Sequence, residues 1–145
     1  MDPHPDFAGI ELPRTFDLPG FRLPPLSPEY LDEDYQAVMS SADVLMGLFG
    51  DWPNGLTREA DLIDLAWHER EFTLRRSFSW IVRSHAGDYL GCAYLFPAPG
   101  RTGQASVVTW IRDTEGRADC LVRVRRELKD WCATRLPPHI DLTWA

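Results

Sequence analysis

Apolar residues recur along the chain with two spacings, which separate the expected strands from the expected helices. Short runs of apolar or alternating residues, bounded by glycine, proline or aspartate, are typical of strands. These runs are 21–26, 78–84, 89–96, 104–112 and 139–144. Apolar residues three or four positions apart are typical of helices. This spacing is present in 43–49, 57–77 and 119–136, and in a segment that starts at residue 28.

The order of these elements predicts an α/β (α+β) domain with one mixed sheet and helices on both of its faces. Short links join 78–84, 89–96 and 104–112, so we expect these strands to form an antiparallel meander. The long helical segment 119–136 can make a right-handed crossover. It would place the last strand, 139–144, parallel to 104–112.

The first 20 residues contain several prolines and are expected to form an extended N-terminal arm. Apolar residues such as Phe7 and Phe16 alternate with the prolines, so we expect the arm to lie against the body of the protein. Residues 21–145 would form a single domain, and 21–26 would enter its sheet as an edge strand, where proline is tolerated.

Two hydroxyl residues precede expected helices and are predicted to cap them. Ser27 is followed by Pro28, a residue favoured at the first helical position, and Thr57 precedes the segment that runs to residue 77. In that second helix, Glu69 falls in the middle of the expected apolar face. The other members of this face are Leu62, Leu65, Ala66, Phe72 and Thr73.

Composition and charge exclude several function classes. The net charge is −7, from 22 acidic and 15 basic residues, and no basic stripe is present, so nucleic-acid binding is not expected. No apolar run approaches the roughly 20 residues that a bilayer span needs. We therefore expect a cytoplasmic protein that does not bind membranes.

Cysteine and histidine are few and scattered. The three cysteines form no C-x-x-C pair, and the four histidines are isolated from one another, so no metal site and no disulfide is expected. The six tryptophans are expected mainly in the core. Trp52 is the exception, since it lies in a turn and is a candidate to line a pocket.

One strand-to-helix junction carries a recognisable loop, Asp113-Thr114-Glu115-Gly116-Arg117-Ala118, directly after Trp110-Ile111-Arg112. Gly116 and Ala118 match the pattern Gln/Arg-x-x-Gly-x-Gly/Ala, with which the GNAT acetyltransferase superfamily binds the pyrophosphate of acetyl-CoA. Asp113 departs from that pattern. The order of elements over residues 20–145 also resembles this family. The resemblance implies a GNAT-like fold with acetyl-CoA as the cofactor.

The loop also makes physical sense as an anion site. The first amides of a helix have no internal partner and lie at the positive end of its dipole. Gly116 would let the backbone approach an anion closely, and the small side chain of Ala118 would not obstruct it. Arg112 and Arg117 add positive charge, whereas Asp113 and Glu115 subtract it.

The resemblance further implies that the strands 104–112 and 139–144 splay apart and leave a cleft. Free backbone groups around Val108 and Trp110 would then bind the pantetheine arm of the cofactor. Residues Val108, Trp110, Arg112, Gly116, Arg117 and Ala118 are therefore the candidate cofactor-binding set.

Acyl transfer to an amine needs a base, and a buried carboxylate with a raised pKa suits that task. Glu69 is the first candidate by helical phase, followed by Asp141 and then His68. Each has a structural alternative: Glu69 can pair with Arg125, Asp141 can lie on the solvent face of an edge strand, and His68 can be a boundary residue.

Two functions from different classes remain open on the sequence. The first is an acyl-CoA-dependent N-acyltransferase that acetylates a small-molecule amine or an amino group. The second is a non-catalytic GNAT-like module that binds a ligand or a partner, and in that case a dimer, such as a homodimer, or a complex that covers the edge of the last strand is expected.

Overall fold

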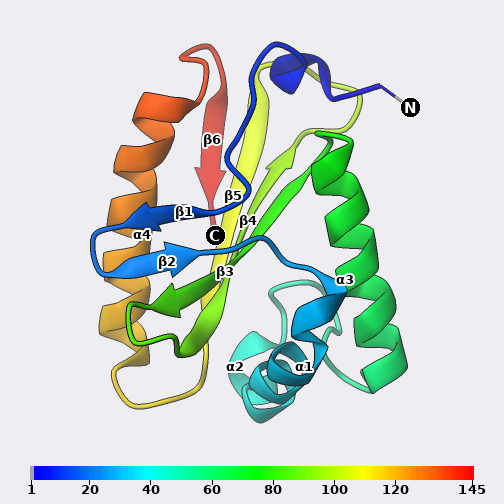
Figure 1. Cartoon of the computed structure of the whole chain (residues 1–145), viewed down its shortest axis with the longest axis vertical. Coiled ribbons are helices and arrows are strands. Elements are labelled where there is room, and N and C mark those ends of the chain that lie inside the picture. The colour runs from blue at the N-terminus through cyan, green and yellow to red at the C-terminus, as the bar shows by residue number, and fades with distance from the viewer. Residues whose placement is uncertain (1) are drawn as a thin grey trace.

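A computed structural model describes residues 2–145, and its centre is a six-stranded mixed sheet with helices on both faces (Figure 1). Adjacent strands of the sheet are consecutive in the chain. The strands are β1 Phe16–Leu18, β2 Phe21–Leu23, β3 Phe78–Ser84, β4 Tyr89–Pro97, β5 Gln104–Ile111 and β6 Asp141–Trp144. The α-helices are α1 Leu31–Ser40, α2 Ala42–Leu45, α3 Arg58–Thr73 and α4 Arg117–Arg135. Two short 3-10 helices, Pro5–Phe7 and Pro28–Tyr30, complete the order.

The predicted topology is confirmed. β3, β4 and β5 form an antiparallel meander, and β6 pairs with β5 in parallel after the crossover through α4. The strands were predictable because their apolar runs are bounded by turn residues such as Gly87 and Gly100, both of which adopt positive φ.

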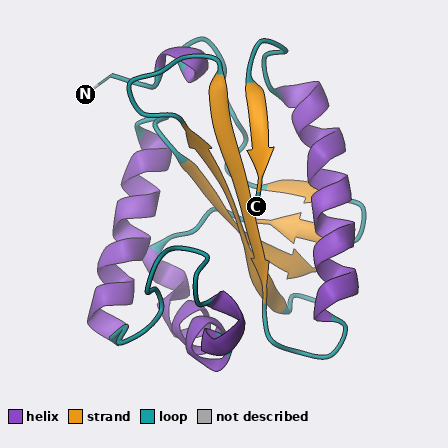
Figure 2. Cartoon of the chain, turned by 180° about the vertical axis from the view of Figure 1, so that it is seen from behind, coloured by secondary structure: helices purple, strands orange, loops and turns teal. Residues whose placement is uncertain are grey.

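Successive residues of β5 point to opposite faces of the sheet and belong to two separate cores. Val107 and Ile111 pack with Val124 of α4, whereas Val108 packs on the other face with Leu65 of α3. Figure 2 shows the resulting layers, with α4 on one side of the sheet and α1, α2 and α3 on the other.

Three elements differ from the sequence expectation. Residues 21–23 are not an edge strand, because Phe16–Leu18 pairs with them as a hairpin and forms the edge itself. The helix expected over 43–49 ends at Leu45, since Gly47 and Gly50 adopt positive φ and pair across a tight turn. The helix expected to reach residue 77 ends at Thr73.

The N-terminal segment is tied to the body of the protein. Phe7 is fully buried in the core. The Gly103 N–H donates to Asp6 Oδ2 over 2.8 Å, and His139 Nε2 lies 3.2 Å from Asp6 Oδ1. Although burial opposes it, these contacts lower the pKa of Asp6, so the carboxylate stays charged.

None of the helices in residues 2–145 is both long and apolar enough to cross a bilayer. Over the same residues, no three His, Cys, Asp or Glu side chains are grouped as a metal site would require.

Candidate functional site

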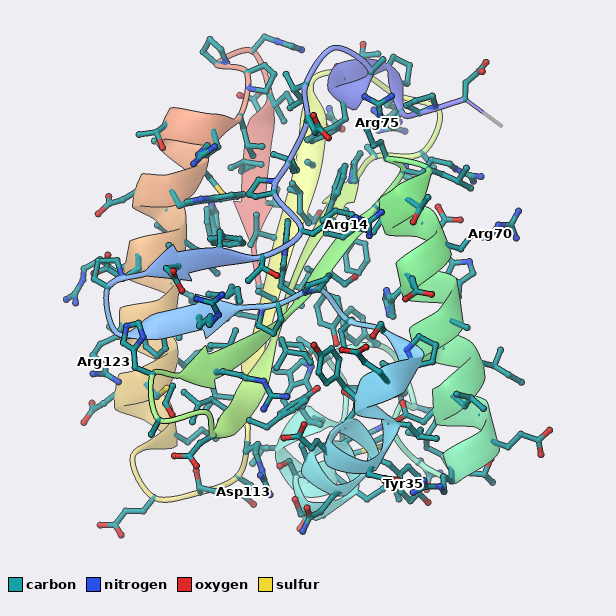
Figure 3. All side chains as sticks on the ribbon, in the orientation of Figure 1. Arg14, Tyr35, Arg70, Arg75, Asp113 and Arg123 are labelled. Carbon is teal, nitrogen blue, oxygen red and sulfur yellow. The ribbon has the colours of Figure 1, made fainter. Side chains whose placement is uncertain are left out.

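The loop between β5 and α4 has the geometry of a helix start that faces outward. Gly116 is the N-cap of α4 and adopts a left-handed conformation, with φ 81° and ψ 9°. Asp113, at the beginning of this loop, is exposed (Figure 3). Its backbone N–H donates to Ser41 Oγ over 3.0 Å, which joins the loop to the α1–α2 corner.

The first turn of α4 leaves amides unused. The first helical hydrogen bond runs from Cys120 N–H to Gly116 C=O over 3.0 Å, and no side chain caps the helix. The N–H groups of Ala118 and Asp119 therefore have no protein partner among residues 2–145. Because they lie at the positive end of a 19-residue helix, they can bind an anion.

The two arginines of the predicted cofactor set are held by the protein. Arg117 Nε donates to the carbonyl oxygen of Ile111 over 2.9 Å. Arg112 reaches Tyr89 C=O and Ser40 Oγ, each at 3.5 Å. The acids Asp113 and Glu115 are exposed. The groups that the helix start offers to an anion are therefore mainly backbone amides.

The structure differs from the sequence expectation about the backbone of Val108 and Trp110. Arg112 N–H donates to Leu90 C=O, and Ala98 N–H donates to Gln104 C=O, so every second residue between 104 and 112 bonds to β4. Val108 and Trp110 belong to this set, and their backbone groups are not free. The expectation failed because strand parity cannot be assigned until the neighbouring strands are in register.

The backbone groups that face β6 are those of the odd-numbered residues. Ala145 N–H donates to Val107 C=O over 2.9 Å, and Thr109 N–H donates to Ala145 C=O over 3.0 Å. The two strands are thus paired, without a splay, as far as Thr109. Beyond it, Thr109 C=O and Ile111 N–H have no hydrogen-bond partner among residues 2–145, and they lead directly to the start of α4.

Neither carboxylate predicted as a base lies at this edge. Glu69 is exposed on α3, whose buried residues are Asp61, Leu65, His68, Glu71 and Phe72. The prediction that Glu69 is buried is therefore wrong. The predicted pairing of Glu69 with Arg125 is also wrong, because Arg125 Nε donates to Thr109 Oγ1 over 3.2 Å. Asp141 is exposed and pairs with Gln104, seven residues from Ile111 along β5. At about 3.3 Å per residue, that is about 23 Å from the loop.

A buried acidic pair was missed by the sequence analysis. Asp34 of α1 and Asp61 of α3 are both buried and close enough for each carboxyl group to shift the pKa of the other, and Asp61 Oδ2 has no hydrogen-bond partner in the described chain. Tyr89 donates its hydroxyl to Asp34 Oδ1. Burial, followed by the neighbouring Asp34, raises the pKa of Asp61 to about 9, so that at neutral pH one proton is held between the two acids.

A cavity of about 270 Å³, here called the aromatic cavity, lies on the α3 side of β4. Its lining residues are Phe49, Trp52, Asp64, Trp67, His68, Tyr94 and Phe96. The expectation that Trp52 lines a pocket is confirmed. His68 is buried, with Nδ1 2.8 Å from Ser79 Oγ and Nε2 3.4 Å from Asp64 Oδ2.

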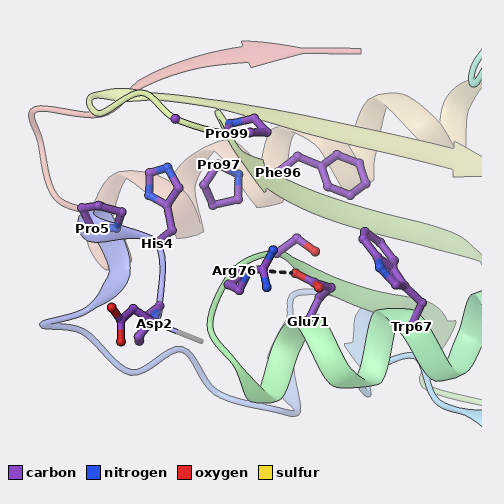
Figure 4. Close-up of a pocket in the computed structure, with 12 residues that line it drawn as sticks. Asp2, His4, Pro5, Trp67, Glu71, Arg76, Phe96, Pro97 and Pro99 are labelled. Carbon is purple, nitrogen blue, oxygen red and sulfur yellow. Dashed lines mark ion pairs between the residues drawn. The ribbon is translucent and has the colours of Figure 1, made fainter.

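A second hollow of about 530 Å³ lies between the N-terminal segment and the C-terminal half of α3. Trp67 and Phe96 line both this hollow and the aromatic cavity, and in Figure 4 they lie at the end of the hollow away from Asp2, His4 and Pro5. Glu71 is buried there and pairs with Arg76 over 3.4 Å. The hydroxyl of Ser77, also a lining residue, is buried without a hydrogen-bond partner in the described chain.

Comparison with solved structures returns acetyltransferases. The ribosomal L7/L12 α-N-protein acetyltransferase RimL, in complex with coenzyme A, superposes with a TM-score of 0.73 at 12% identity, over 90% of this chain and 73% of its own. The microcin C7 self-immunity acetyltransferase MccE, with acetyl-CoA and AMP, gives 0.65 at 10% identity over 86% and 68%.

A GCN5-related N-acetyltransferase from Brucella melitensis gives a TM-score of 0.65 at 18% identity, over 94% of this chain and 60% of its own. No family model and no curated protein sequence matches the chain. The similarity therefore lies in the arrangement of the elements and not in the sequence. The chain has the fold of the GNAT superfamily of acetyltransferases.

Proposed function

We propose that the chain is an acyl-CoA-dependent N-acyltransferase that acetylates an amine, either a small molecule or an amino group of a protein. The observation that carries the proposal is one row of open backbone groups. It begins with Thr109 C=O and Ile111 N–H on the edge of β5 and continues with the N–H groups of Ala118 and Asp119 at the start of α4.

The helix end of this row fits a pyrophosphate. The amides of Ala118 and Asp119 are unpartnered, and Gly116 presents no side chain in front of them. A Cβ atom added to Gly116 would meet no atom within 4 Å, so the space beside the N-cap is open. A charge-assisted hydrogen bond contributes about 1.5–3 kcal/mol, so two of them outweigh the repulsion from exposed acids that water screens.

The strand end of the row fits the amide-containing pantetheine arm. Thr109 C=O and Ile111 N–H point in the same direction as the groups that bond to Ala145. An extended chain with amides can add to such an edge as a further parallel strand would. Acetyl-CoA, when bound, supplies an acyl group that is activated as a thioester.

The chain itself must remove one proton from the amine as the new C–N bond forms and the C–S bond breaks. His68 is the side chain we propose for this step, in place of Glu69 and Asp141. Its ring is fixed by Ser79 and Asp64 and lies 5.5 Å from the ring of Tyr94. Tyr94 is paired with Val108 of β5, so the aromatic cavity is one strand away from the proposed cofactor edge.

The structural relatives support this proposal. One of them is a protein α-N-acetyltransferase in complex with coenzyme A, and another holds acetyl-CoA. The first is an acetyltransferase of a ribosomal protein, and the second was solved with the small molecule AMP. Both a protein amino group and a small-molecule amine are therefore tested as acceptors.

The direct test is a thiol-release assay with acetyl-CoA and a panel of primary amines and N-terminal peptides. We expect release of coenzyme A that depends on both the amine and the enzyme. His68→Gln should lower kcat at least about 100-fold, a typical share for general-base catalysis, without unfolding the protein. Absence of thiol release with every acceptor, under conditions where acetyl-CoA binds, would exclude the enzyme function.

That same outcome would favour the alternative, a GNAT-like module that binds a ligand without turnover. The exposed acids Asp113 and Glu115, with Asp119 in the first turn of α4, are the observation behind this alternative, since they weaken the attraction of the site for a polyanion.

A further inference from the structure

The aromatic cavity gathers five aromatic rings, one imidazole and one carboxylate from three parts of the fold. Phe49 and Trp52 come from the loop after α2, Asp64, Trp67 and His68 from α3, and Tyr94 and Phe96 from β4. We propose that this cavity binds a small organic cation, an alkylated ammonium group, between the rings and Asp64.

The arrangement of the rings suits a cation. Phe49 is nearly perpendicular to Tyr94 and to Phe96, with centroid distances of 5.5 and 6.2 Å. The ring of Trp52 lies 5.6 Å from that of Phe49 and is inclined to it by 69°. Rings set at such angles can direct their electron-rich faces at one enclosed group, and alkylated ammonium ions bind in cages of this kind.

The exposure of two rings shows that the cavity is open to a ligand. Trp67 is 46% exposed and Phe49 is 36% exposed, although both are large and apolar. Their neighbours Tyr94 and His68 are buried. A ligand in the cavity would cover apolar surface that is otherwise in contact with water.

The charges around the cavity favour a positively charged ligand. The side chain of Asp64 is 49% exposed at the cavity, and no arginine or lysine is among the lining residues in the described part of the chain. Asp34, which forms an acidic pair with Asp61, is near enough to Tyr94 to act on its hydroxyl and adds a further negative charge close to the cavity. An anion would be repelled here, whereas the half-exposed carboxylate of Asp64, which also contacts His68, can pair with a cation.

The cavity is also held open in advance. Tyr35 of α1 donates its hydroxyl to Leu56 C=O over 3.0 Å, which ties the end of the loop that carries Phe49 and Trp52 to α1. Ser79 fixes the ring of His68 through the contact between its hydroxyl and Nδ1. Little ordering of the protein is therefore needed on binding.

The identification of this cation as part of the acyl acceptor rests on the proposed function, whereas the binding itself does not. If both hold, the acceptor is an amine that also carries an alkylated cationic group, or one whose own ammonium group enters the cage before it loses a proton to His68.

The test compares choline with its neutral isostere 3,3-dimethylbutan-1-ol by tryptophan fluorescence and calorimetry on the whole chain. We expect choline to bind at least about tenfold more tightly than the alcohol. Asp64→Asn should weaken choline binding about fivefold or more, and Trp67→Leu about threefold or more. The matched controls Glu59→Gln, exposed on the same helix, and Trp144→Leu, outside the cavity, should stay within about twofold of wild type.

Equal binding of choline and the alcohol, unchanged choline affinity in Asp64→Asn, or no binding of either probe would overturn the cation site. A parallel titration with acetyl-CoA separates the two proposals. Choline binding without acetyl-CoA binding would contradict only the enzyme function, and acetyl-CoA binding without choline binding would contradict only the cation site.

Discussion

Gly91 of β4 and Trp110 of β5 approach so closely that no side chain fits between them. A Cβ atom added to Gly91 would lie 1.9 Å from the carbonyl oxygen of Trp110, well inside van der Waals contact. This contact sets the spacing of the two strands just before the loop that leads to α4.

Gly91→Ala should therefore destabilise the protein by about 3 kcal/mol or more, because the backbone of β5 must move to admit the methyl group. Chemical denaturation measures the change. Gly9→Ala is the control, since a Cβ atom there meets nothing within 4 Å, and its cost should stay within about 0.5 kcal/mol. Similar costs for the two variants would show that the strands do not approach as described.

The two hydroxyls predicted as helix caps behave differently, which gives a second prediction. Thr57 Oγ1 accepts a hydrogen bond from Ala60 N–H over 3.1 Å, whereas Ser27 makes no capping bond with its side chain. Thr57→Ala should cost about 1 kcal/mol of stability, and Ser27→Ala clearly less. A larger loss in Ser27→Ala, measured by urea denaturation, would contradict the assignment.

The raised pKa of Asp61 gives a third prediction, about pH. The folded chain holds a proton on this carboxyl up to about pH 9, whereas the unfolded chain releases it near pH 4. In this window the folded state binds more protons, so this group makes the free energy of unfolding fall as pH rises. The slope is at most about 1.4 kcal/mol per pH unit.

Asp61→Asn should remove that slope and stabilise the protein at pH 8 relative to wild type, because the amide can donate to Asp34 without a proton to lose. The exposed Asp43→Asn serves as the control and should leave the slope as it is. The free energy of unfolding, measured between about pH 5 and 8 for wild type and both variants, tests this prediction. An equally steep curve in Asp61→Asn would mean that the pair holds no extra proton.

The sheet and its order could be predicted from the sequence because each strand is an apolar run with turn residues at its ends. The position of Gly116 between a strand and a helix was predictable for the same reason. These features depend on residues that are neighbours in the chain.

The buried face of α3 could not be predicted in this way. Helical phase favours a face through Leu62 and Ala66, but both are exposed, and Asp61 and His68 are buried instead. His68 contacts Ser79, and Asp61 lies beside Asp34, so the neighbours of both buried polar groups come from other elements. Burial of such a polar residue depends on a neighbour from a distant part of the chain, and that neighbour cannot be identified from a single sequence.

The aromatic cavity follows the same rule. Of its seven lining residues, only Trp52 carried a local signal, its place in a turn with Pro53. The other rings meet because α3 crosses the sheet beside β4, and that crossing depends on long-range packing.

In the proposed function, the open amides at the start of α4 bind the pyrophosphate of acetyl-CoA. Isothermal titration of the whole chain with coenzyme A tests it most directly, with Ala118→Glu as the variant and Ala133→Glu, exposed near the other end of α4, as the control. We predict that wild type and Ala133→Glu bind coenzyme A alike and that Ala118→Glu binds at least about tenfold more weakly. No heat of binding in wild type, or equal affinity in Ala118→Glu, would contradict the account.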